Sequence, residues 1–259
     1  MLLECSGLSK SYGNVKALRG VDFRLSEGLS FIIGPNGSGK TTLIKILSRL
    51  IDPDSGEIRV NGVDYRKMDG RRLGFSFEKT VFPSRIKIGE YLSAVAEFRG
   101  EDNSGELIEL FGLKEYQNRR FGGLSQGYKR RFLVALAFAG WPDVVFLDEP
   151  FSNVDIIAKK EMVERFYELK GKVSIVVVSH VFSGLENLDS LLVLYNGSVV
   201  SNLIGKELEE LQGFRAVFED GTVVENDLNA LMERIRSGER VVRIQPYTLE
   251  EIILRMLGV

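Results

Sequence analysis

The stretch at 34–41 reads Gly34-Pro35-Asn36-Gly37-Ser38-Gly39-Lys40-Thr41. It fits the pattern G-x-x-x-x-G-K-[ST], which indicates the fold of the chain. A short apolar strand, 31–33, precedes it, and an apolar helical face follows at Leu43, Ile46, Leu47 and Leu50. In that context the backbone N–H groups of a glycine-rich loop and the positive end of the helix dipole cradle the phosphates of a nucleotide. We expect Lys40 to reach the β- and γ-phosphates and the Thr41 hydroxyl to bind Mg²⁺, with Thr42 beside it.

A pair of carboxylates follows a second apolar run. Val144 to Leu147 is continuous in apolar residues, as buried parallel strands usually are, and it ends in Asp148-Glu149-Pro150. Ligands of open α/β sheets lie beyond the carboxyl ends of the strands, so Asp148 is expected to hold Mg²⁺ directly or through water. Glu149 can point at the water that attacks the γ-phosphate, as a general base or an orienting group. By itself such a pair would more simply be a solvated turn, and the assignment depends on the phosphate loop.

Strand and helix patterns alternate through most of the chain. Residues 1–33 and 54–76 are predicted as short strands, and 86–140 as an inserted helical subdomain. An amphipathic helix at 156–170 leads into the apolar strand 173–178. This alternation predicts an α/β core with a parallel sheet.

The last 55 residues are predicted as a small separate α+β unit. Phe214, Ala216 and Phe218 alternate toward an Asp220-Gly221 turn, which indicates a hairpin. A helix is expected at Leu228, Leu231, Met232 and Ile235, and a capping box of Thr248 and Glu251 opens a final helix. We therefore expect one domain at 1–205 and an extension at 206–259.

Composition excludes several classes of protein. The 259 residues carry 34 basic and 36 acidic side chains, a net charge of −2, whereas a chain that grips nucleic acid usually has a basic excess. The single cysteine, Cys5, cannot form an internal disulfide and suits a reducing, cytoplasmic compartment. No apolar stretch approaches the roughly 18 residues that span a bilayer, and no signal peptide is recognised. A function at a membrane would therefore need a membrane-spanning partner on another chain.

Further motifs, in order along the chain, resemble the ATP-binding cassette (ABC) ATPases. Leu124-Ser125-Gln126-Gly127-Tyr128 is similar to the family signature Leu-Ser-x-Gly-Gln, and Ser125 lies 23 residues before Asp148. Asp155, in Ser152-Asn153-Val154-Asp155, falls where the family has its D-loop. His180, 32 residues after Asp148, falls at the family's switch histidine, and Tyr12 where an aromatic ring stacks on adenine. The resemblance covers about residues 2–205.

The resemblance implies a P-loop NTPase fold: a RecA-like parallel sheet, an N-terminal antiparallel β-subdomain and an inserted helical subdomain. It also implies that two cassettes, two copies of this chain or this chain and a paralogue, face each other head to tail. Each ATP, with Mg²⁺, would lie between residues 34–41 of one chain and 125–127 of the other. His180 would donate a hydrogen bond to the γ-phosphate, and hydrolysis would loosen the dimer.

Two positions depart from the family pattern. Glu78 stands where the family's Q-loop has Gln; it could bind the metal, or it could point away and leave its place to water. A carboxylate there would face the γ-phosphate with like charge. Tyr128 replaces the last residue of the signature. The first turn of the following helix carries three basic residues, Lys129, Arg130 and Arg131. They form either a solvated basic face or a face that lies opposite a phosphate or a partner protein.

The resemblance favours the ATPase subunit of a membrane transporter, an enzyme that converts ATP and water into ADP and phosphate. It would sit at the cytoplasmic face of the membrane, bound to a membrane-spanning partner that docks near residues 78–100. Nucleic acid is not expected as a partner. The tail at Thr248 to Ile252 is similar to that of export-type (ABC-2) cassettes. A soluble cassette of the iron–sulfur assembly type is the alternative. A small-molecule kinase would explain neither residues 124–127 nor His180.

Overall fold

A six-stranded sheet forms the centre of the computed structural model, which describes residues 3–179, 188–205, 207–208, 214–225, 233–235 and 237–246. Its strand order is β10-β9-β3-β8-β7-β6, and all neighbours are parallel except β10, which runs antiparallel to β9. The strands are β3 (Leu29–Ile33), β6 (Leu73–Ser76), β7 (Val144–Asp148), β8 (Ser174–Ser179), β9 (Ser190–Tyr195) and β10 (Ser198–Ile204). The predicted α/β core with a parallel sheet is confirmed.

The central strands are buried on both faces, which explains why they are continuously apolar. Phe31 and Ile33 of β3 belong to one core cluster, while Ile32 between them belongs to the other. The first cluster is covered by the helices that follow residue 88, and the second by α1 (Lys40–Leu47) together with the N-terminal strands. The phosphate loop between β3 and α1 therefore starts at the carboxyl end of a strand fixed from both sides.

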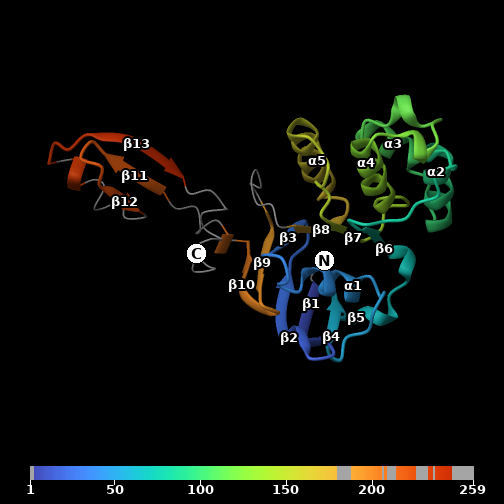
Figure 1. The fold of residues 1–259 in the computed structure, drawn as a ribbon, viewed down its shortest axis with the longest axis horizontal. Coiled ribbons are helices and arrows are strands. Elements are labelled where there is room, and N and C mark those ends of the chain that lie inside the picture. The colour runs from blue at the N-terminus through green and yellow to red at the C-terminus, as the bar shows by residue number, and fades with distance from the viewer. Residues whose placement is uncertain are drawn as a thin grey trace.

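A second sheet, antiparallel and four-stranded, lies below the central one in Figure 1, in the order β2-β1-β4-β5. Its strands are β1 (Leu3–Tyr12), β2 (Val15–Leu25), β4 (Ser55–Val60) and β5 (Val63–Asp64). Asn61 and Gly62 join β4 to β5 with φ of 50° and 76°, the positive values that a tight hairpin turn requires. This sheet is the expected N-terminal β-subdomain.

Helices α2 (Ile88–Arg99), α3 (Ser104–Leu110) and α4 (Gln126–Ala137) gather on the far side of the central sheet (Figure 1). Short 3₁₀ turns join the elements at Tyr65–Lys67, Gly70–Arg72, Lys114–Tyr116 and Phe121–Gly123. Helix α5 (Ile156–Leu169) packs Met162 and Phe166 into the core cluster that contains Phe31 and Ile33. These helices match the predicted helical insertion and the predicted amphipathic helix.

A three-stranded sheet, β12-β11-β13, stands apart from the other two sheets in Figure 1. The predicted hairpin is present as β11 (Phe214–Phe218) and β12 (Val223–Glu225), and β13 (Val241–Pro246) adds a strand that the pattern did not predict. The helix expected at 228–235 lies outside the described residues apart from 233–235, and the helix expected at Thr248 lies wholly outside them. Within the described part of the chain, no helix has the length and hydropathy needed to cross a bilayer.

Candidate nucleotide-binding site

The phosphate loop is held in a conformation that only glycine adopts easily. Gly39 caps α1 with φ of 106°, and a Cβ added there would lie 2.5 Å from the Ala17 carbonyl oxygen. Pro35, Asn36 and Gly37 are exposed, while Gly34 and Ser38 are buried beneath them. Helix α1 begins at Lys40 with no acidic side chain in its first turn and no side-chain cap, so its positive end is available to a phosphate.

The Lys40 ammonium folds back onto this loop. Its Nζ donates to the carbonyl oxygens of Gly34 at 2.6 Å and Pro35 at 3.0 Å. Burial lowers the pKa of Lys40, and the negative charges of Glu149 and Asp148 oppose that effect. A buried ammonium whose hydrogen bonds within the described residues go to neutral carbonyls would gain from a phosphate, because charge-assisted hydrogen bonds are the stronger kind. Thr41, the next residue of α1, is exposed, and Thr42 is partly buried.

The two carboxylates lie at the carboxyl end of β7: Asp148 is its last residue and Glu149 follows it. Asp148 is 8% exposed, and burial, followed by the nearby charge of Glu149, raises its pKa to about 6. Glu149 has φ of 46°, a left-handed backbone that is uncommon outside glycine and often marks functional sites. The Ser179 hydroxyl donates to Glu149 Oε2 at 3.0 Å, and Glu149 N–H donates to the Val178 carbonyl at 2.8 Å. Strand β8 thus fixes both the backbone and the carboxylate of Glu149.

The burial of Arg130 was not predicted from the sequence. The residue is 5% exposed, so it belongs to neither a solvated basic face nor a partner-facing one. Its Nη1 donates to the Phe77 carbonyl at 2.7 Å, its Nε to the Pro150 carbonyl at 3.2 Å, and its Nη2 to the Asp148 carbonyl. Arg130 stands four and seven residues before buried Val134 and Ala137, and this helical spacing was the signal for burial.

The signature and the D-loop lie side by side in this chain. A Cβ added to Gly127 would be 3.8 Å from the Asn153 carbonyl oxygen. Ser125 caps α4, its Oγ accepting from Tyr128 N–H at 3.4 Å, and Asp155 caps α5, its Oδ1 accepting from Ala158 N–H at 2.9 Å. Leu124 is buried, whereas Ser125, Gln126 and Asp155 are exposed. The exposed caps leave the N-terminal ends of both helices accessible to a second molecule.

The remaining predicted positions have different outcomes. Tyr12 is 48% exposed at the tip of the β1–β2 hairpin, where its ring is accessible to a base. Glu78 is exposed; its backbone N–H lowers the pKa of Asp148, and its charge raises that pKa. Tyr128 packs on Tyr116, with ring centroids 3.9 Å apart. His180 lies outside the described residues.

Mg²⁺ fits the donors at this site. Among the described residues, no cluster of three or more His, Cys, Asp or Glu side chains forms a metal cage. Mg²⁺ does not require one, because it is usually held by one or two carboxylates together with water and substrate phosphates. The buried Asp148 carboxylate, its pKa raised by burial and by acidic neighbours, would be relieved by a divalent cation, and the Thr41 hydroxyl can supply a second oxygen.

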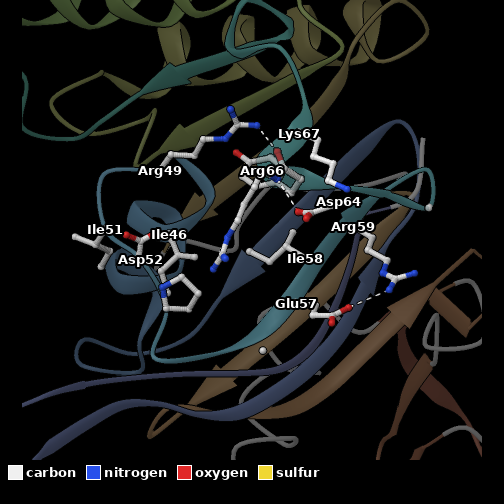
Figure 2. Close-up of a pocket in the computed structure, with 14 residues that line it drawn as sticks. Ile46, Arg49, Ile51, Asp52, Glu57, Ile58, Arg59, Asp64, Arg66 and Lys67 are labelled. Atoms are coloured by element: carbon white, nitrogen blue, oxygen red, sulfur yellow. Dashed lines mark hydrogen bonds and ion pairs between the residues drawn. The ribbon is translucent and has the colours of Figure 1, made fainter.

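One surface hollow of about 560 Å³ lies at the opposite end of α1 from Lys40. Figure 2 shows it lined by charged side chains, of which Glu57 and Arg59 form an ion pair at 3.0 Å. Asp64 likewise accepts from Arg66 N–H at 2.9 Å. None of the predicted site residues lines this hollow, so it is separate from the phosphate loop.

Comparisons with known proteins agree with this arrangement. The sequence pattern of the family described as ABC transporter matches residues 18–152. The chain is 32% identical to the ABC transporter ATP-binding protein YxlF of Bacillus subtilis over 76% of this chain and 69% of that protein. It is 33% identical to the lipoprotein-releasing system ATP-binding protein LolD 1 of Rhodopirellula baltica, over 77% and 96%. A solved ATP-binding subunit of an ABC transporter has the same fold, with a TM-score of 0.76 at 24% identity over 99% of this chain and 100% of that one.

Proposed function

The chain belongs to the ABC transporter family as an ATP-binding and ATP-hydrolysing subunit, and from this premise we propose a role for each residue of its nucleotide site. Residues Gly34–Thr42 hold the phosphates of ATP, with Lys40 on the β- and γ-phosphates and Tyr12 on the adenine ring. Asp148 and Thr41 hold Mg²⁺, which supplies charge neutralisation at the phosphates. Residues Leu124–Gly127 and Asp155 of a second cassette close over the nucleotide.

Glu149 is proposed as the group that orients or deprotonates the attacking water. One observation carries the proposal: Glu149 and Asp148, at the carboxyl end of β7, are close enough for their charges to act on the buried Lys40 ammonium of the phosphate loop. The hydrogen bond from Ser179 to Oε2 fixes the orientation of the Glu149 carboxylate. A carboxylate positioned in this way typically contributes about 10²–10⁴-fold to a hydrolysis rate.

The test of this assignment is hydrolysis measured beside nucleotide binding. Glu149→Gln should keep the ATP affinity of the parent and lose most of its phosphate release, because only the base is removed. Lys40→Ala should lose ATP binding itself. If Glu149→Gln turns over at the parent rate, then the water is activated by another group and the assignment of Glu149 is wrong.

We further propose that a membrane-spanning subunit on a separate chain recruits this cassette to the cytoplasmic face of the membrane. The support is the family, whose members are named as ATP-binding proteins of lipoprotein-release and other transport systems. Tagged Glu149→Gln, loaded with ATP and mixed with detergent-solubilised membranes of the native source, should co-purify a polytopic membrane protein. Recovery of soluble partners alone would favour the iron–sulfur assembly type of cassette.

A further inference from the structure

Arg130 joins three segments at the carboxyl edge of the central sheet. It belongs to helix α4, which starts at the signature, and its guanidinium binds the carbonyls of Phe77, just beyond β6, and of Asp148 and Pro150, at the end of β7. The residue is almost fully buried. An arginine fork on three carbonyls fixes their relative positions more tightly than a lysine could, because its donors are held in one plane.

One peptide group links Arg130 to the Asp148 side chain. The carbonyl of the Phe77–Glu78 peptide accepts from Arg130, and the N–H of the same peptide is close enough to the Asp148 carboxylate to lower its pKa. Since Arg130 also donates to the Asp148 carbonyl, the guanidinium fixes this peptide and the Asp148 backbone relative to each other. Any shift of Arg130 is therefore transmitted to the carboxylate and to Glu78.

A second guanidinium, that of the half-buried Arg99, supplies a comparison. Arg99 of α2 also donates to three carbonyls, those of Ala137 at 3.3 Å, Ala139 at 3.0 Å and Leu73 at 3.3 Å. Burial lowers the pKa of both arginines. The charges of Asp148, Glu78 and Glu149 act on Arg130, whereas burial is the only influence that shifts the pKa of Arg99 within the described residues. The two side chains thus share a bonding pattern and differ in their distance from the carboxylates.

We propose that Arg130 is a positioning residue for the ATPase site, which ties the signature helix to the Q-loop peptide and sets the Asp148 carboxylate and Glu78 for the metal. Its positive charge also offsets the carboxylate that Glu78 brings in place of the family's neutral Gln. Arg130 and Glu78 then act as a pair. This inference rests on the proposed role of Asp148 as a Mg²⁺ ligand.

The test compares Arg130→Met and Arg130→Lys with the matched control Arg99→Met. We expect Arg130→Met to raise the Mg²⁺ concentration for half-maximal ATP hydrolysis by about 10-fold or more, as loss of a residue that orients a metal ligand usually does. Arg130→Lys keeps the charge but loses the fork, and should recover only part of this loss. Arg99→Met should lower stability and leave the Mg²⁺ midpoint where the parent has it. Adding Glu78→Gln to Arg130→Met should bring the midpoint back toward the parent.

Amide hydrogen exchange without nucleotide gives an independent result. The Glu78 N–H should exchange faster in both Arg130 variants and at the parent rate in Arg99→Met, because Arg130, unlike Arg99, donates to the carbonyl of that peptide. Equal effects of Arg130→Met and Arg99→Met on the midpoint and on exchange would overturn the proposal and leave Arg130 a purely structural residue. If the parent itself does not hydrolyse ATP, the proposed function fails, and exchange at Glu78 still decides the role of Arg130. If Arg130→Met does not fold, Arg130→Lys decides both measurements.

Discussion

Replacing Asp148 by Asn should stabilise the nucleotide-free protein while weakening its function. Burial and the neighbouring carboxylates raise the pKa of Asp148 from 3.8 to about 6, so the folded chain pays to keep this group ionised at neutral pH. Asn has nearly the same shape and carries no charge, and its amide oxygen can replace a carboxylate oxygen near the Glu78 N–H. The variant removes the cost of ionisation and keeps the shape of the side chain.

The size of the effect follows from the shift in pKa. Each unit is worth about 1.36 kcal/mol, so ionising Asp148 costs the folded state about 3 kcal/mol above pH 6. Because the pKa is higher in the folded state than in the unfolded state, the folded protein binds the extra proton between about pH 4 and 6. Stability of the parent therefore falls as pH rises through that window. The advantage of the variant should shrink by about 1.4 kcal/mol between pH 7.5 and pH 5.

Urea unfolding of parent and variant at both pH values, in EDTA and without nucleotide, measures this difference. Mg²⁺ and ATP should then stabilise the parent more than Asp148→Asn, since the variant lacks the metal ligand. A variant that is no more stable than the parent at pH 7.5, or an advantage that does not change with pH, would refute the electrostatic account of Asp148.

Three further results are expected. Gly39→Ala should abolish ATP binding and destabilise the chain, because its Cβ would lie 2.5 Å from the Ala17 oxygen at φ of 106°; ATP binding at the parent affinity in a calorimetric titration would contradict this. Asp155→Ala should lose about 1 kcal/mol of stability in urea, since it removes the cap on Ala158 N–H at 2.9 Å, whereas Asp155→Asn should lose less. Cys5 should resist alkylation at pH 8 until the protein unfolds, because burial raises the pKa of its thiol to about 12; rapid labelling of the native protein would count against that burial.

Local sequence patterns were sufficient to predict the strands with continuous apolar runs and the phosphate loop, whose motif fixes its backbone conformation. The phosphate loop requires glycines at fixed positions, and the apolar runs at 144–147 and 173–178 match β7 and β8 within one residue at each end. The carboxylates follow directly, because the end of a parallel strand is also the edge where ligands bind.

Long-range contacts were the part that spacing did not reveal. Arg130 was grouped with its basic neighbours, yet its partners are carbonyls 53, 18 and 20 residues away, which no local pattern identifies. The positive φ of Glu149 and its bond from Ser179 likewise depend on the pairing of β7 with β8. Strand β13 was not predicted, although Val242, Arg243, Ile244 and Gln245 alternate between apolar and polar residues as strands do. Arg130 shows that a charged residue on a buried helical face is difficult to recognise from its immediate neighbours.

The most direct test of the account is the mass of Glu149→Gln in solution with and without ATP. The chain of 29.0 kDa should be a monomer without nucleotide and twice that mass with ATP and Mg²⁺, because hydrolysis no longer separates the two cassettes. The double variant Lys40→Ala with Glu149→Gln should stay monomeric under both conditions. A Glu149→Gln protein that binds ATP tightly and remains a monomer would contradict the shared site between two cassettes.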